Sequence, residues 1–254
     1  MENKIEGYEK LKPLGSVPYN TFVVLRNKDK LKMIAKEINY KKYDKTARKR
    51  IVDTINSLVQ LRSDSVVRYH NCVVDNGHLI LIADYYQNGS LHYYIKSEWG
   101  NISEDRMWDI ITDIALGLYE CHNHKPNQIL HGNLNSKNVF LDESYNVKIG
   151  NFSLDCSNVG EEKDLMNFGF IIYELVTGNV FDKEQFISQM QSPKLNEGFK
   201  ELLYGLFKKN FSLLDILEFP EVSLKILEKK IKLEKIIYEK EKAKYLKLES
   251  SFQT

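Results

Sequence analysis

The spacing of the apolar residues changes once along this chain of 254 residues, and that change limits the folds that the chain can adopt. Up to about residue 85, apolar residues fall in short runs separated by turn residues, which is typical of strands joined by tight turns. The exception is the stretch 45–61, where apolar residues three or four positions apart predict one helix. After residue 90 the spacing is helical over most of the chain. The sequence therefore predicts a strand-rich part with one helix, followed by a helix-rich part.

Composition narrows the functions that the chain can have. Hydrophobic residues make up 43% and charged residues 28%, which suits a globular protein. Lys and Arg (36) nearly balance Asp and Glu (35), so there is no bulk electrostatic reason to expect a nucleic-acid partner. The longest apolar runs are too short to span a bilayer. The cysteines are scattered, without metal-ligand spacing, at Cys72, Cys121 and Cys156. We therefore expect a cytoplasmic protein with reduced thiols, no membrane or nucleic-acid partner and no metal centre.

The last part of the chain, residues 220–254, is rich in Lys and Glu and predicts a long helix. Apolar residues recur there at every seventh position, at Leu224, Ile231, Tyr238, Tyr245 and Phe252. Glutamates interrupt the second apolar row that a coiled coil needs. Two interpretations remain open: a solvated helix with one face docked on its own domain, or a coiled coil with a protein partner or a second copy of the chain, giving a homodimer.

Several short motifs stand in the order found in protein kinases. Residues 129–141 resemble the catalytic loop H-R-D-L-x-x-x-N and the strand after it, and their Asn-Val-Phe-Leu-Asp ending resembles the NIMA-related serine/threonine kinases. Residues 147–153 stand where that family has D-F-G, and Asp164 resembles the first residue of its buried central helix. Upstream, residues 33–36 resemble V-A-I-K and residues 14–16 the start of the glycine-rich loop. Several weak motifs in one order make a strong resemblance.

The resemblance to the protein kinase superfamily implies an α+β, two-lobed fold. Residues 1–84 would form the N-lobe, an antiparallel sheet with one helix. Residues 85–219 would form the helical C-lobe with a shortened activation segment. Residues 220–254 would form the charged C-terminal helix.

The residues that carry phosphoryl transfer in this family are replaced. Asn133 stands at the position of the catalytic aspartate, and a carboxamide cannot act as a base near neutral pH. Asn151 stands at the position of the D-F-G aspartate, which holds Mg²⁺, a cation that prefers charged oxygen ligands. Asn135 replaces a lysine expected near the transferred phosphate, and Gly132 replaces the arginine of H-R-D. We therefore expect no catalytic residue in this chain.

The nucleotide-binding motifs survive only in part. Gly15 is the one glycine left of G-x-G-x-x-G, because Val17 and Asn20 take the other two positions. Lys36 and Asn138 are retained, and together with Gly15 they are the residues that would contact ATP. We expect no bound cofactor; ATP is the alternative, with a poor Mg²⁺ site.

Two expectations concern the small lobe. Phe22 stands where a smaller valine is expected over the adenine, and we expect it to fill the part of the pocket that the small Ala83 leaves open. Counting along the motifs puts Thr54 where a glutamate should pair with Lys36, with Asp53 one residue away. The ion pair of an active kinase is therefore expected to be missing.

The segment between the D-F-G position and the central helix is short. Twelve residues separate Asn151 from Asp164, too few for an activation loop and a peptide-docking platform. We therefore expect a pseudokinase, a protein-binding scaffold or allosteric regulator whose partner is an active kinase or a cytoskeletal protein. The alternatives are a weak or unconventional ATP-dependent serine/threonine phosphotransferase and an ATP-binding sensor that transfers nothing.

Overall fold

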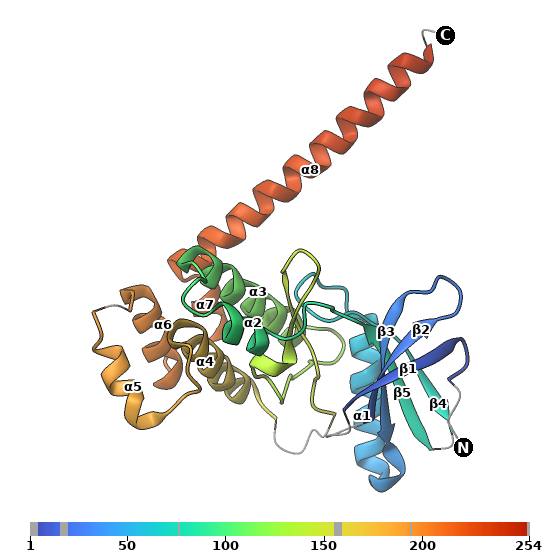
Figure 1. Ribbon diagram of the computed structural model, residues 1–254, viewed down its shortest axis with the longest axis horizontal. Helices are drawn as coiled ribbons and strands as arrows, with labels where there is room; N and C mark the ends of the chain where they lie inside the picture. The colour runs from blue at the N-terminus through green and yellow to red at the C-terminus, as the bar shows by residue number, and fades with distance from the viewer. Residues whose placement is uncertain (1–4, 16–19, 76, 155–158, 194, 253–254) are drawn as a thin grey trace.

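The protein has a sheet lobe and a helical lobe, from which one long helix projects (Figure 1). The computed structural model describes residues 5–15, 20–75, 77–154, 159–193 and 195–252. Val17 and Cys156 lie outside these residues. The predicted α+β, two-lobed architecture is confirmed.

The sheet lobe is an antiparallel five-stranded sheet in the order β1-β2-β3-β5-β4. Its elements are β1 Tyr8–Gly15, β2 Asn20–Arg26, β3 Lys32–Asn39, the short 3₁₀ helix η1 Tyr40–Lys42, α1 Lys45–Gln60, β4 Tyr69–Asp75 and β5 His78–Asp84. One face of the sheet carries a small apolar cluster that includes Met33, Ala35 and Ile82. The other face belongs to the main core, which continues into the helical lobe.

Helix α1 packs through the face that the sequence predicted. Ile51, Ile55 and Leu58 are buried, and the side chain of Asp44 caps the helix by accepting a hydrogen bond from the backbone N–H of Ala47 at 2.8 Å. Because side chains three and four positions apart share one face, Asp53, which lies between them, points away from that face and is exposed to solvent.

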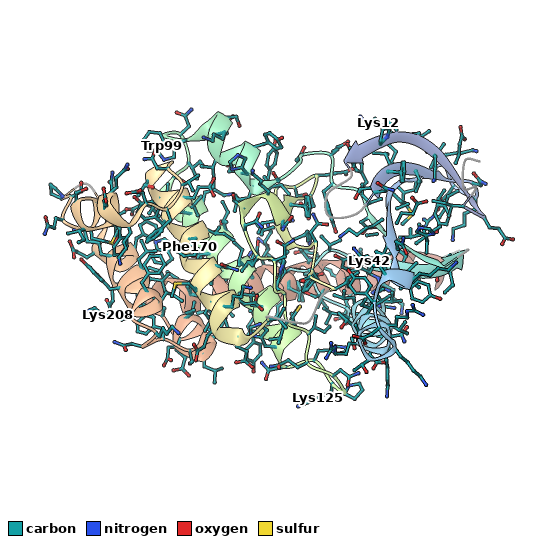
Figure 2. All side chains as sticks on the ribbon, turned by 90° about the horizontal axis from the view of Figure 1, so that it is seen from below. Lys12, Lys42, Trp99, Lys125, Phe170 and Lys208 are labelled. Atoms are coloured by element: carbon teal, nitrogen blue, oxygen red, sulfur yellow. The ribbon has the colours of Figure 1, made fainter. Side chains whose placement is uncertain are left out.

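The helical lobe is built around α4, which is buried on most sides. Its elements are α2 Leu91–Glu98, α3 Glu104–His122, the 3₁₀ helix η2 Ser136–Asn138, β6 Val139–Leu141, β7 Val147–Ile149, α4 Glu161–Thr177, α5 Lys183–Met190, α6 Glu197–Phe207 and α7 Leu213–Leu217. Figure 2 shows Phe170 on α4 inside this lobe, where its ring contacts those of Phe181 and Phe207 with centroids 4.8 and 5.6 Å apart. The central place predicted for α4 is confirmed.

Helix α8, Pro220–Phe252, is docked only at its beginning (Figure 1). Val222 is fully buried, and the Lys225 Nζ lies between carboxylates of α3 and of its own helix. The Lys229 Nζ lies 3.0 Å from Asp113 on α3. In contrast, every residue from Ile231 to Lys244 is exposed. The first three turns of α8 are therefore docked on the chain's own domain, whereas the stretch that follows is exposed. Within the described part of the chain, no helix is long and apolar enough to cross a membrane.

Candidate functional site

A cleft of about 390 Å³ lies between the two lobes. Leu14 of β1, Ile34 and Lys36 of β3 and Ala83 of β5 line its upper part. The segment that follows β5 and the loop around β6 line its lower part, and Asn151 lies at its inner end. A concave, mostly apolar cavity with a few polar groups at one end is the usual form of a small-molecule site.

A chain of hydrogen bonds crosses the inner end of the cleft. The Lys36 Nζ donates to Asn151 Oδ1 at 2.7 Å, and Asn151 Nδ2 donates to Asn138 Oδ1 at 2.9 Å. Asn138 Nδ2 in turn donates to the backbone carbonyl of Asn133 at 2.7 Å, while Asn133 Nδ2 donates to the carbonyl of Asn151 at 3.2 Å. The structure thus brings together four residues that the sequence singled out.

The two ends of this chain fix the orientation of both carboxamides. An ammonium can only donate and a backbone carbonyl can only accept. Asn151 must therefore turn its oxygen to Lys36 and its NH₂ to Asn138, and Asn138 must turn its NH₂ to the carbonyl of Asn133. Each side-chain amide oxygen along this path thus faces an N–H donor. We use the name amide chain for Lys36, Asn151, Asn138 and the carbonyl of Asn133.

The amide chain is a poor site for Mg²⁺. That ion needs several oxygen ligands in near-octahedral geometry, with carboxylates among them. Here Asn138 Oδ1 and Asn151 Oδ1 already accept hydrogen bonds, and neither residue carries a charge. Over the described residues, no three His, Cys, Asp or Glu side chains gather in a way that could hold a metal ion. The residues present do not fit the metal.

Lys36 is buried, with 8% of its surface exposed, and burial lowers its pKa to about 8. Asp53 is the single acidic residue in the sequence of α1, and it lies on the solvent-exposed side of that helix. Thr54, the residue at the expected glutamate position, is half-buried. In this arrangement, α1 brings no carboxylate to Lys36, and Asn151 supplies the acceptor instead.

Asp164, at the start of α4, fixes the backbone of the loop that resembles the kinase catalytic loop, residues 129–141. Its two carboxylate oxygens accept hydrogen bonds from the backbone N–H groups of His131 and Gly132, both at 2.8 Å. The side chain of His122 adds a third contact at 3.0 Å. Burial alone would raise the pKa of Asp164, but these hydrogen bonds hold it below its ordinary value. Asp164 therefore has a structural role, because it fixes the backbone of this loop.

An aromatic stack joins the lobes behind the amide chain. The rings of His131 and Phe152 are stacked with centroids 4.4 Å apart, and Phe152 meets the ring of Tyr69 edge-on at 6.3 Å. The Tyr69 hydroxyl accepts a hydrogen bond from the backbone N–H of Asn151 at 3.2 Å. Burial lowers the pKa of His131 to about 4, so the imidazole is neutral. His131 therefore supports the loop.

The expectation for Phe22 is wrong. In the register of the sheet Phe22 lies opposite Ala35, and both belong to the cluster on the face away from the cleft. Tyr69 is the residue beside the small Ala83, which it faces across β4 and β5, and both line the cleft. Counting from Gly15 misplaced β2 by one residue, and one residue reverses the face to which a strand side chain points.

Gly132 has a conformation that suits glycine. Its φ is +65°, and a Cβ there would lie 2.4 Å from Cγ1 of Val159 and 3.0 Å from Cβ of Ser153. The short segment after β7 thus packs against the position where the family has arginine, and an arginine side chain has no room there.

The other positions named from the sequence lie outside the amide chain. Asn135 serves its own loop: its Oδ1 accepts from the backbone N–H of Lys137 at 3.0 Å, and its Nδ2 donates to the carbonyl of Asn133 at 2.9 Å. Gly15 ends β1 and Asn20 begins β2. The cleft residues that the sequence did not single out include Tyr69 and Lys137. Lys137 directly precedes Asn138 in the motif, which was the one signal available for it.

The class of protein follows from this geometry and from comparison with known proteins. The model of the protein kinase domain matches residues 8–163, more than half of the chain. The chain belongs to the protein kinase family, whose members typically use ATP and Mg²⁺.

Similar proteins include NIMA-related kinases, as the catalytic loop predicted. The chain is 26% identical to serine/threonine-protein kinase Nek2 of Mus musculus over 209 residues, which cover 69% of this chain and 47% of that protein. It is 30% identical to Nek2 of Homo sapiens over 162 residues, 61% of this chain and 36% of that protein. The match to the probable kinase nek2 of Dictyostelium discoideum is also 30%, over 59% of this chain and 37% of that protein. The chain thus spans less than half the length of these relatives.

Proposed function

We propose that this kinase-family chain is a pseudokinase, which transfers no phosphoryl group and acts by binding other proteins. The amide chain is the observation that supports this proposal. Where the reaction needs a base and a metal ligand, the chain has Asn133 and Asn151, and their side chains donate hydrogen bonds to neighbouring oxygens. Loss of a general base alone typically lowers the rate by about 10²–10⁴, against roughly 1–100 s⁻¹ for active kinases.

The test is transfer from γ-labelled ATP. Purified chain is incubated with labelled ATP and Mg²⁺ or Mn²⁺, with a general protein substrate and without one. We expect no labelled product, and the same result for Lys36→Met. Metal-dependent labelling that Lys36→Met abolishes would show that the chain is the weak phosphotransferase named as the alternative.

The double variant Asn133→Asp with Asn151→Asp separates two reasons for inactivity. If the carboxamides alone are responsible, this variant gains labelled product. We expect it to remain inactive, because Gly132 and the short segment before α4 leave no platform for a protein substrate. The rate of ATP hydrolysis by this variant is measured alongside, because hydrolysis needs no protein substrate.

The binding role is proposed for the exposed stretch of α8. All residues from Ile231 to Lys244 are exposed, and Ile231, Ile237 and Tyr238 place 57%, 47% and 61% of their surfaces in solvent. A charged helix with such side chains can pair with another helix. We propose a protein partner in the cytoplasm, an active kinase or a cytoskeletal protein, or a second copy of the chain.

Removal of residues 231–254 tests this role, because the docked turns of α8 remain. We expect the truncated chain to keep its thermal stability and to lose self-association, measured as molar mass by light scattering, or capture of its protein partner. A chain whose mass and bound partners do not change on truncation would exclude α8 as the attachment element.

The cleft favours a second candidate, a nucleotide sensor that binds without transfer. It remains open at about 390 Å³, and the charged Lys36 is held at its inner end by Asn151. Such a sensor would change its partner binding when nucleotide is added, and Lys36→Met would remove that response.

A further inference from the structure

The charges that line the cleft are unevenly distributed. Two lysines line it: Lys36, which contacts Asn151 at the inner end, and the exposed Lys137, which directly precedes Asn138 in the chain. Asp84 is the one acidic side chain among the described residues that line the cleft. It ends β5, and its Oδ1 lies 2.6 Å from His70 Nε2, so this carboxylate is already paired. The inner end therefore has a positive potential.

The opposite end suits a flat apolar group. Leu14 and Ile34 line it together with Tyr86 and Phe140, whose rings are stacked at 6.4 Å with an interplanar angle of 20°. An aromatic ligand with a negatively charged tail matches both ends at once, because dispersion holds the ring and the ammonium groups hold the charge.

We infer that the cleft binds a nucleotide as its metal-free polyanion, and that Mg²⁺ weakens this binding instead of promoting it. The inference rests on the proposed function, because it takes the neutral amide chain as the working form of the site. In a kinase that transfers phosphoryl groups with Mg²⁺, the metal promotes nucleotide binding, whereas here it should weaken that binding.

Two physical reasons give this sign. A divalent cation at the inner end would lie beside the ammonium group of Lys36, and it would have to displace the N–H donors that now occupy Asn138 Oδ1 and Asn151 Oδ1. In addition, Mg²⁺ bound to the phosphates in solution cancels two of their negative charges, which weakens their attraction to Lys36 and Lys137. Both effects oppose binding of the metal complex.

The experiment is calorimetric titration of the full chain with ATP, once in EDTA and once with MgCl₂ in excess over ATP. We expect a measurable dissociation constant in EDTA and a several-fold larger one with Mg²⁺. Lys137→Met should weaken the binding in EDTA by about tenfold, the loss of one charged contact. Lys42→Met is the matched control, since Lys42 is exposed and does not line the cleft, and it should leave the binding unchanged.

Asn151→Asp tests the reason for the metal effect. A carboxylate there adds a metal ligand and reduces the positive potential, so this variant should bind ATP more weakly than the wild type in EDTA and gain affinity from Mg²⁺. Tighter binding of ATP by the wild type in Mg²⁺ than in EDTA, or no binding in EDTA, would overturn the inference. Absence of binding leaves the pseudokinase proposal standing, whereas labelled product from ATP would overturn both.

Discussion

Asn138→Leu would remove the centre of the amide chain at nearly constant shape. Asn138 has 8% of its surface exposed, and its side chain makes two hydrogen bonds, at 2.9 Å to Asn151 Nδ2 and at 2.7 Å to the carbonyl of Asn133. Each bond contributes about 1 kcal/mol, and leaving its partner buried and unpaired costs about 1–3 kcal/mol. Because these terms overlap, we expect a loss of about 2–4 kcal/mol in the free energy of unfolding, or roughly 5–15 °C in Tm.

Urea denaturation of the wild type and the variant measures this loss. Asn56→Leu, an exposed asparagine of α1, is the control and should change the free energy of unfolding by less than about 0.5 kcal/mol. A double-mutant cycle with Lys36→Met should give a coupling of about 0.5–3 kcal/mol, because Asn151 links both residues. Two results would refute the reasoning that the amide chain acts as a unit: a loss in the free energy of unfolding below about 1 kcal/mol for Asn138→Leu, or additive effects of Asn138→Leu and Lys36→Met.

Other variants test the surroundings of the site. Gly132→Arg should destabilise the fold instead of restoring the family's motif, since a Cβ there would meet Val159 Cγ1 at 2.4 Å; thermal denaturation with an unchanged Tm would contradict this. His131 has a pKa of about 4 when folded and about 6.5 when unfolded, so stability should fall as pH drops from 6.5 to 4, by about 3 kcal/mol. His131→Phe should remove that part of the acid sensitivity in urea titrations, and an unchanged pH profile would count against it. Tyr69→Phe loses the hydroxyl that accepts from the backbone N–H of Asn151 and should cost about 1 kcal/mol in the same assay, whereas no cost would mean that the hydrogen bond contributes nothing.

The main architecture could be predicted because each element carried its own signal. The spacing of Ile51, Ile55 and Leu58 identified both α1 and its buried face, and the resemblance at Asp164 identified the start of the central helix α4. The order of the motifs then brought Lys36 and Asn151 to one site although 115 positions separate them in the chain.

The register of β2 could not be obtained in the same way. Phe22 was placed by counting from Gly15, and an offset of one residue in such a count moves a strand side chain to the opposite face of the sheet. Phe22 was therefore assigned to the cleft when Tyr69, from β4, is the large side chain beside Ala83. The amide chain was also beyond reach, because it depends on which atoms of Asn138 and Asn151 face each other in three dimensions.

The claim that the carboxamides bind each other instead of a metal can be measured directly by NMR. Mn²⁺ broadens the signals of nuclei close to it, so the side-chain NH₂ signals of Asn138 and Asn151 are followed while Mn²⁺ is added to the chain together with ATP. We expect no more broadening of these signals than of the exposed Asn56 signal. Selective loss of the Asn138 and Asn151 signals would place the ion at the amide chain and contradict the account.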